Sequence, residues 1–66
     1  MRSVRVKVNR VRPGDIALHR RGLDGREVAR IERDAEGEWQ VWIWINTLEA
    51  GPYSANNYTF IRKVPE

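Results

Sequence analysis

The segment that most constrains the fold is EWQVWIWIN, which spans residues 38–46 and holds all three tryptophans of the chain. Its odd positions are apolar, and its even positions place Trp42 and Trp44 on the opposite face. A period of two carried by β-branched and aromatic residues is typical of a β-strand. Because an uncharged run such as VWIWI aggregates when it is exposed, we expect this strand to lie inside a sheet, paired along both edges.

The length and composition restrict the chain to one small domain, which we expect to span residues 1–66. A chain of this size buries only about 60% of the surface of its unfolded state, so its core is small. Cysteine is absent, which excludes disulfides and thiolate metal sites, and His19 alone cannot form a histidine-rich metal site. We therefore expect no metal or cofactor, and stability that comes mainly from packing of the tryptophans.

Four further segments share the strand pattern: VRVKVN (4–9), IALHR (16–20), REVARIERD (26–34) and YTFIRKV (58–64). A bulge near Asn9–Arg10 would return Val11 to the core side of the first strand. REVARIERD also contains good helix formers. It lies between the turn signals Asp24-Gly25 and Glu36-Gly37, however, so we predict a strand.

Turn sequences separate these strands: RPGD (12–15), RGLDG (21–25), DAEGE (34–38) and TLEAGPYSANN (47–57). The last of these also fits a single 3-10 turn before the final strand. Asp15, which follows Gly14, is expected to cap the first turn by accepting backbone N–H groups. Five short strands joined by tight turns predict an all-β, five-stranded small barrel. Its predicted core consists of Val4, Val6, Val8, Ile16, Leu18, Ala29, Ile31, Val41, Ile43, Ile45, Phe60 and Ile61.

Two stretches resemble members of the SH3-like barrels. RPGDIALHRRGLDGREVARIERDAEGEWQVWI is similar to the Tudor and KOW types, which open with Gly-Asp and a strand and continue through a Gly-containing hairpin to a WxV strand. GPYSANNYTFIRKV looks like the end of an SH3 domain, where a Pro-containing 3-10 turn leads into the last strand. The resemblance implies a five-stranded SH3-like barrel. The compact, arginine-rich style is also similar to small proteins of actinobacterial phages.

The chain departs from the ligand-binding members of these families at their binding sites. The Ala-Leu-Tyr-Asp-Tyr segment of peptide-binding SH3 domains is missing, although Trp39 matches the position of their ligand-binding tryptophan. A Tudor-like aromatic cage would have to recruit Trp39, Tyr53 and Tyr58, and their spacing does not show that they converge. Neither kind of ligand is therefore carried over to this chain.

Charge is distributed unevenly along the chain, whose net charge is +3. Residues 1–33 hold ten Lys/Arg and four Asp/Glu, a net charge of +6. Residues 34–66 hold two Lys/Arg and five Asp/Glu, a net charge of −3. This asymmetry indicates a basic patch and an anionic partner, although surface charge also serves solubility.

We predict a non-enzymatic module that binds nucleic acid through a basic sheet face, with weak sequence preference. Cations neutralise phosphates, and aromatic rings stack on bases. The candidate binding residues are Arg5, Lys7, Arg10, Arg12, Arg20, Arg21 and Arg30, with Trp42 and Trp44 as stacking platforms. The pattern equally allows the two indoles to be covered by the chain's own strands, loops or arginine stems.

A protein partner is the alternative interpretation. Two indoles beside Ile and Val have the composition of an interface hot spot, so Trp42 and Trp44 could form a homodimer contact or the docking surface of a small adaptor for a phage or host protein. Catalysis is not predicted, because the chain has no cysteine nucleophile, one isolated histidine and carboxylates in a solvated turn.

The start of the chain, MRSVRVKVNR, is charged and lacks the apolar core of a signal peptide. The longest apolar run, VWIWI, is far shorter than the roughly 18 residues of a spanning helix. We therefore expect a cytoplasmic protein that does not enter a membrane.

Overall fold

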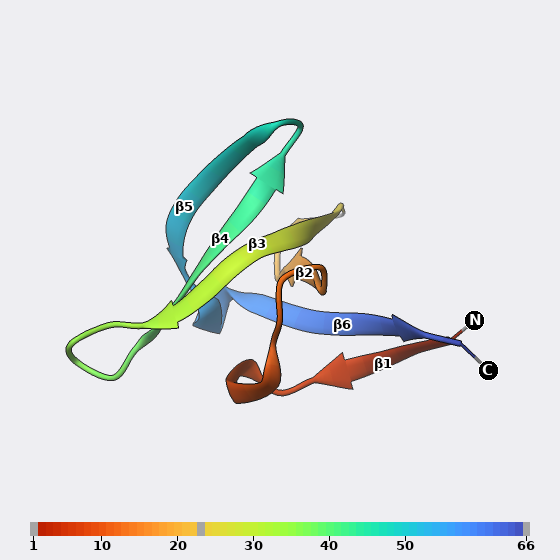
Figure 1. Ribbon diagram of the computed structural model, residues 1–66, viewed down its shortest axis with the longest axis horizontal. Helices are drawn as coiled ribbons and strands as arrows, with labels where there is room; N and C mark the ends of the chain where they lie inside the picture. Colours follow the sequence, from red (N-terminus) through yellow and green to blue (C-terminus); the bar gives the residue numbers. More distant parts are fainter. Residues whose placement is uncertain (1, 23, 66) are drawn as a thin grey trace.

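The computed structural model describes residues 2–22 and 24–65. In this part of the chain the regular structure consists of strands and two 3-10 turns, with no α-helix, which confirms the all-β class (Figure 1). The elements are β1 (Arg2–Val6), η1 (Val8–Arg10), β2 (Ile16–His19), β3 (Gly25–Arg33), β4 (Trp39–Ile45), β5 (Leu48–Ser54), η2 (Ala55–Asn57) and β6 (Tyr58–Val64).

All the strands belong to one antiparallel sheet, in the order β1-β6-β2-β3-β4-β5. The tryptophan strand, β4, is paired with β3 on one side and β5 on the other, as predicted. The sheet is open, since β1 and β5 are its edges and no described pair joins them. The structure thus has six strands in place of the predicted five, and the predicted barrel closure is not confirmed.

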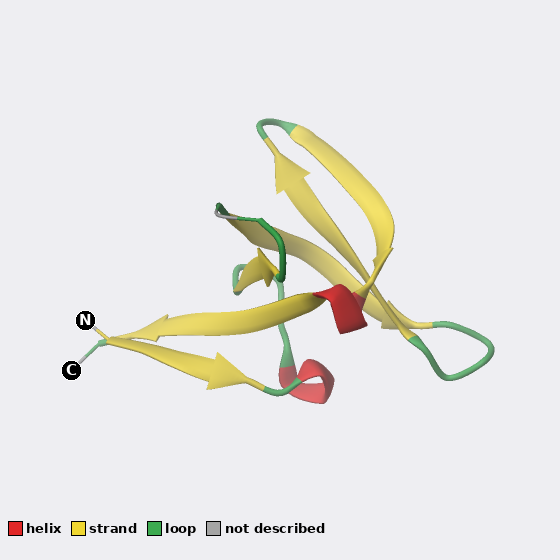
Figure 2. Cartoon of the chain, turned by 180° about the vertical axis from the view of Figure 1, so that it is seen from behind, coloured by secondary structure: helices red, strands yellow, loops and turns green. Residues whose placement is uncertain are grey.

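The two ends of the sheet diverge in space. In Figure 1 the β1–β6 ladder runs along the bottom and carries both termini at its right-hand end, whereas the β4–β5 hairpin projects to the top. Figure 2, seen from behind, shows the same separation between this ladder and the hairpin. Surfaces built on β1 and surfaces built on the β4–β5 hairpin are therefore distinct.

The additional strand is β5, which lies inside the segment predicted as a turn-rich loop. β4 passes into β5 through a two-residue turn in which Asn46 has a positive φ of 57°. At Gly51 and Pro52 the pairing is interrupted, and the register shifts between Val41 and Ile43 of β4. Proline, which has no N–H for a ladder, is confined in sheets to edge strands and bulges, and β5 supplies both.

The buried core consists of Val6, Val11, Ala17, Val28, Val41, Ile43, Ala55 and Phe60. The predictions for Val6, Val41, Ile43 and Phe60 are confirmed. The predicted core residues that are only half-buried are Val4, Val8, Ile16, Leu18, Ala29, Ile31 and Ile61. Ile45, also predicted to be buried, is 37% exposed, because the end of the β4–β5 hairpin extends beyond the core.

Local features reverse the predicted facing of β2 and of the first part of β3, where Val28 is buried in place of Ala29, whereas Ile31 packs against the core as predicted. In β2 three consecutive residues are apolar, so alternation does not select a face, and the small Ala17, opposite Phe60, is the buried one. In β3 the register with β4 shifts between Val28 and Arg30. This bulge turns both Val28 and Ile31 toward the core although three positions separate them.

The chain after β1 returns to the core through η1 rather than through the predicted bulge. The N–H of Arg10 donates to the carbonyl of Lys7 at 2.8 Å and closes a 3-10 turn. Val11, immediately after this turn, is buried as predicted.

The turns at 12–15 and 34–38 form as predicted. The N–H of Asp15 donates to the carbonyl of Arg12 at 3.1 Å, and the N–H of Asp34 donates to the carbonyl of Glu38 at 2.8 Å. The predicted RGLDG turn includes residue 23, which lies outside the described residues, and the flanking strands β2 and β3 pair antiparallel. Neither of the 3-10 turns in the described ranges is long or apolar enough to cross a membrane.

Asp15 joins three separate segments of the fold. Its carboxylate is buried and accepts hydrogen bonds from the backbone N–H of Arg12 at 2.9 Å and from Nε and Nη2 of Arg62 at 2.8 Å each. Its carbonyl accepts the N–H of Val28 at 2.7 Å. The Arg62 hydrogen bonds hold the pKa of Asp15 below its ordinary value, against the burial that raises it. The predicted cap therefore also fixes the 12–15 turn to β3 and β6.

Candidate nucleic-acid interface

A groove of about 770 Å³ lies where β1 leaves the sheet and η1 begins. It forms because β1 pairs with β6 only as far as Val6 opposite Phe60, so that the first residues of β6 are paired on one side, with β2. We call it the basic groove. Its lining comprises the cations Arg5, Lys7 and Arg20, the polar residues Asn9, Asn56 and Thr59, and the apolar or aromatic residues Val6, Val8, Ala55, Tyr58 and Phe60.

The three cations reach the basic groove from both sides of the start of β6. Arg5 lies on β1 opposite Ile61, and Lys7 immediately precedes η1, where its carbonyl closes the 3-10 turn. Arg20 follows β2, on the other side of β6, and its N–H donates to the carbonyl of Asn57 in η2 at 3.0 Å. Residues far apart in sequence are thus held around one depression.

The basic groove is positively charged because its described lining contains cations and no carboxylate. Among the residues that the structure describes, no aspartate or glutamate lines it. Within the same ranges, no ion pair involves Arg5, Lys7 or Arg20. Within the described residues these charges are not neutralised by a carboxylate, so they can neutralise phosphates, which releases the counterions condensed on a polyanion.

A smaller groove of about 320 Å³ adjoins the basic groove across η1 and shares Asn9 with it. Its other lining residues are Arg10, Val11, Arg12 and Arg62. Arg62 is committed to Asp15, and its Nη2 also donates to the carbonyl of Arg10 at 3.1 Å. This leaves the side chains of Arg10 and Arg12 as the exposed cations of the smaller groove.

Tyr58, the aromatic residue of the basic groove wall that is only half-buried, belongs to an aromatic cluster. The centroid of its ring lies 5.1 Å from that of His19 in an edge-on arrangement, and 6.3 Å from the rings of Tyr53 and Phe60. Burial, together with the neighbouring Tyr53, raises the pKa of Tyr58, so its phenol keeps its proton at neutral pH. The cluster orients a neutral aromatic ring beside the cations.

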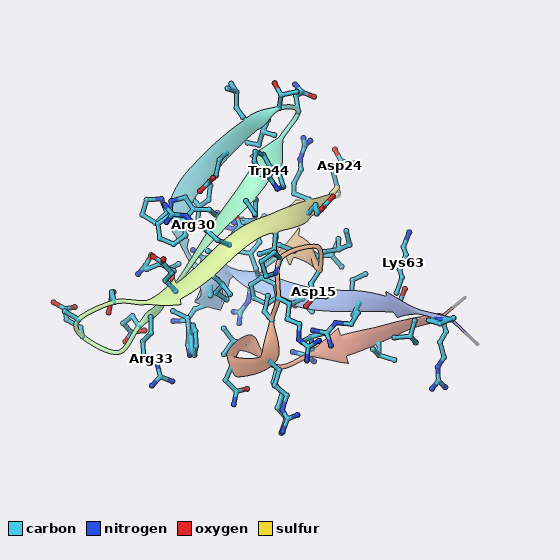
Figure 3. All side chains as sticks on the ribbon, in the orientation of Figure 1. Asp15, Asp24, Arg30, Arg33, Trp44 and Lys63 are labelled. Carbon is cyan, nitrogen blue, oxygen red and sulfur yellow. The ribbon has the colours of Figure 1, made fainter. Side chains whose placement is uncertain are left out.

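Trp42 and Trp44 lie on another surface, formed by β3, β4 and β5. Trp42 is half-buried, and Trp44 is 38% exposed. The guanidinium carbon of Arg30 lies 4.0 Å from the centroid of the Trp42 ring. In Figure 3, Arg30 and Trp44 occupy the upper half of the molecule, whereas β1 and η1 lie at the bottom.

The charge of Arg30 is locally compensated. Its Nε donates to Oε1 of Glu49 at 2.8 Å, and its Nη1 lies 3.5 Å from Oε1 of Glu32. One cation between two carboxylates gives this tryptophan surface no net positive charge, in contrast to the basic groove. The sequence left open whether an arginine of the chain covers these indoles, and the guanidinium of Arg30 lies over the ring of Trp42.

All of the candidate binding residues except Arg21 thus fall into three groups. Arg5, Lys7 and Arg20 line the basic groove, and Arg10 and Arg12 line the smaller groove. Arg30, Trp42 and Trp44 share the tryptophan surface. Arg21 is exposed, lines neither groove, and donates its backbone N–H to Nδ1 of His19 at 3.1 Å.

The residues that would make a Tudor-like cage are only partly assembled. Tyr53 and Tyr58 are neighbours, but the guanidinium of Arg33 lies 4.7 Å from the centroid of the Trp39 ring. A cation of the chain itself therefore already lies over the face of that indole. The cage is not free to take a foreign cation on Trp39.

The polar residues of the basic groove, Asn9, Asn56 and Thr59, were not predicted from the sequence. The available signal was the Asn56-Asn57 pair directly before the last strand, in a segment that also carries Tyr58. Their meeting with Asn9 depends on how β1 and β6 pair, which no local pattern specifies.

Comparison with known proteins identifies no relative. No family model, curated protein or solved structure matches the chain. Among the described residues, no group of three or more histidine, aspartate or glutamate side chains is arranged to hold a metal ion. In its described residues the chain is a small all-β protein with one open antiparallel sheet and a groove lined by Arg5, Lys7 and Arg20.

Proposed function

We propose that this protein is a non-enzymatic module that binds nucleic acid through the backbone phosphates, with the basic groove and the adjoining smaller groove as its contact surface. The observation that carries the proposal is the convergence of Arg5, Lys7 and Arg20 on a groove without a described carboxylate. Phosphate contacts by such cations supply affinity that is largely independent of sequence.

We also propose that the fold is an open relative of the SH3-like barrels. In support, β2, β3, β4 and β5 follow one another in the sheet, η2 precedes the last strand, and β6 returns to pair with β2. β1 is then an additional strand along the outer edge of β6. The basic groove exists because of this addition, since β1 and η1 form one of its walls.

Binding at low salt to random-sequence duplex DNA, single-stranded DNA and RNA, followed by fluorescence anisotropy, tests this proposal. The variant Arg5→Ala/Lys7→Ala/Arg20→Ala should bind at least about tenfold more weakly than the wild type, because each cation contributes a phosphate contact. The control variant Arg2→Ala/Arg21→Ala/Lys63→Ala removes the same charge from exposed positions outside both grooves. Equal weakening in the two variants, or no binding by the wild type to any of the three polymers, would refute the proposal.

A second candidate function is self-association through the β4–β5 hairpin. Trp44, Ile45 and Leu48 are 38%, 37% and 72% exposed, so the hairpin carries large apolar side chains with no described cover. Tryptophan-centred contacts are typical of interface hot spots, and a second copy of the chain would present the same surface. If this is correct, sedimentation at two protein concentrations shows a dimer that Leu48→Ser weakens and that high salt leaves intact; a monomer throughout excludes it.

A further inference from the structure

We infer that the basic groove takes an unpaired segment of a single strand, with one base inserted against Tyr58, rather than a duplex. This inference rests on the proposed function and concerns the same site. It adds the strand type and the mode of contact, both of which follow from features of the groove other than its charge.

The first feature is the shape and the floor of the groove. Its volume of about 770 Å³ lies within the range of roughly 300–1,000 Å³ of pockets that enclose small organic ligands. By its floor we mean the apolar part of its lining, which comprises Val6, Val8 and Ala55. The outer surface of a duplex is lined by phosphates and sugars, and its bases are stacked inside, so a duplex would leave this floor without a partner. An unstacked base can enter and cover it.

The second feature is the aromatic ring in the wall. Tyr58 is half-buried, and contacts with His19, Tyr53 and Phe60 hold its orientation. Bases of single strands stack on such rings whatever their identity, because every base presents a π-face. Since its ring is fixed before the ligand arrives, little side-chain entropy is lost on binding.

The third feature is a pair of amides. Asn9 in η1 and Asn56 in η2 are exposed and line the groove from the two 3-10 turns. Within the described ranges, neither side chain makes a hydrogen bond to the protein, and neither is used as a helix cap. A carboxamide offers both donors and acceptors, which suits the edge of an unpaired base.

The three features combine with the cations into one arrangement. Arg5 and Lys7 on one side of the start of β6, and Arg20 on the other, can neutralise the phosphates that flank the inserted nucleotide. Tyr58 stacks on its base, and the amides contact the base edge. RNA and DNA strands share the phosphates and the π-faces of the bases that this arrangement contacts, and they differ in the 2′-hydroxyl and in the methyl group of thymine. They are therefore two sources of the same ligand chemistry.

The test compares affinities of the wild type for single-stranded DNA, single-stranded RNA and duplex DNA of one sequence at the same salt concentration. The single strands should bind about tenfold more tightly than the duplex or better, which is the gain expected from stacking one base. A strand that carries 2-aminopurine should lose fluorescence on binding, because the inserted base stacks. The relative affinities for the DNA strand and the RNA strand show which of the two polymers the groove prefers.

Variants separate stacking from charge. Asn9→Ala/Asn56→Ala and Tyr58→Leu should weaken binding of the single strand several-fold without changing its salt dependence, whereas Tyr58→Phe, which keeps the ring, should bind like the wild type. Thr47→Ala, an exposed substitution outside the groove, serves as the control. If Tyr58→Leu fails to fold, the affinity of the Asn9→Ala/Asn56→Ala variant and the 2-aminopurine fluorescence still test whether a base is inserted.

The outcomes distinguish this inference from the function on which it rests. A duplex that binds as tightly as the single strands, or 2-aminopurine fluorescence that is unchanged on binding, overturns the inference and leaves phosphate binding in place. Absence of binding by all three polymers at low salt overturns both.

Discussion

Replacement of Asp15 by alanine should destabilise the fold more than replacement of any exposed carboxylate. The side chain of Asp15 is 5% exposed, and Asp15 is the buried charged residue of the described structure. Its two oxygens accept both hydrogen bonds from Arg62 and the N–H of Arg12. Alanine would remove all three bonds and release the 12–15 turn from β6.

The magnitude follows from the burial of the two partners. Breaking a buried ion pair by removing one partner costs about 3–5 kcal/mol, because the remaining charge is uncompensated. The Arg62 side chain is 32% exposed and keeps its bond to the carbonyl of Arg10, so water and this carbonyl compensate part of the loss. We therefore expect Asp15→Ala to lower the free energy of unfolding by about 2–3 kcal/mol and the Tm by roughly 10–20 °C.

Urea denaturation followed by tryptophan fluorescence measures this loss. Glu36→Ala, which removes an exposed carboxylate from the β3–β4 turn, should change the free energy of unfolding by less than about 0.5 kcal/mol. A double-mutant cycle with Arg62→Ala should show that the two side chains are coupled. An Asp15→Ala variant as stable as Glu36→Ala would refute the role assigned to this junction.

The same carboxylate predicts how stability depends on pH. The pKa of Asp15 is lower in the folded than in the unfolded chain, so the folded state favours the ionised form. The stabilisation is fully present above about pH 4, the ordinary pKa of aspartate, and is lost as the pH falls through the lower folded pKa. Asp34, whose pKa is lowered chiefly by the N–H of Glu38, contributes in the same direction. Asp15→Asn should therefore reduce, without abolishing, the loss of stability that urea denaturation measures as the pH falls below about 4.

Two further pairs of substitutions test the β5 bulge and the tryptophan surface. Gly51 has a φ of 140°, and a Cβ there would lie 2.9 Å from the carbonyl oxygen of Val41, so Gly51→Ala should cost about 2–3 kcal/mol in urea denaturation. Gly37→Ala, at φ 84° with no atom within 4 Å of the added Cβ, should cost only about 1 kcal/mol; equal losses would contradict this account of the β5 bulge. Trp42→Ala should cost about 2 kcal/mol and Trp44→Ala less than about 1 kcal/mol, because Trp42 is half-buried beneath Arg30 whereas Trp44 is 38% exposed. Neither tryptophan variant should change nucleic-acid affinity in an anisotropy titration, and a clear loss would move the binding site to this surface.

The sequence predicts those elements whose signals are local. The alternation in residues 38–46 and the turn residues at 12–15 and 34–38 suffice to place β4 and its neighbouring turns. Asp15 was predicted as a turn cap on local grounds, which the hydrogen bond from Arg12 confirms. Its second partner, Arg62, lies 47 positions away and leaves no local signal.

The errors arise where tertiary structure overrides a local pattern. Gly51 and Pro52 are strand breakers in an interior strand but are tolerated in the bulged edge strand β5, so the sequence shows a loop where the structure has a strand. The bulge in β3 reverses the predicted facing of the first part of that strand, which a strict period of two cannot represent. Both effects depend on which strands become neighbours.

The sequence predicted that the candidate site contains arginine and lysine, but it did not predict where in the fold the site lies. Arginine and lysine in the first half of the chain did indicate a basic patch, and the structure brings Arg5, Lys7 and Arg20 into one groove. The indoles of β4, which the sequence joined to that patch, lie on another surface with Arg30. Sheet order decides this separation, since three strands, β6, β2 and β3, lie between β1 and β4.

The salt dependence of nucleic-acid binding tests the central claim most directly. The slope of log K against log salt concentration falls by about one for each phosphate contact that is removed. The variant Arg5→Ala/Lys7→Ala/Arg20→Ala should therefore lose about three units of slope relative to the wild type, and the charge-matched Arg2→Ala/Arg21→Ala/Lys63→Ala variant should keep the wild-type slope. Identical slopes for the two variants would contradict the account, because they would show that the basic groove does not hold the phosphates.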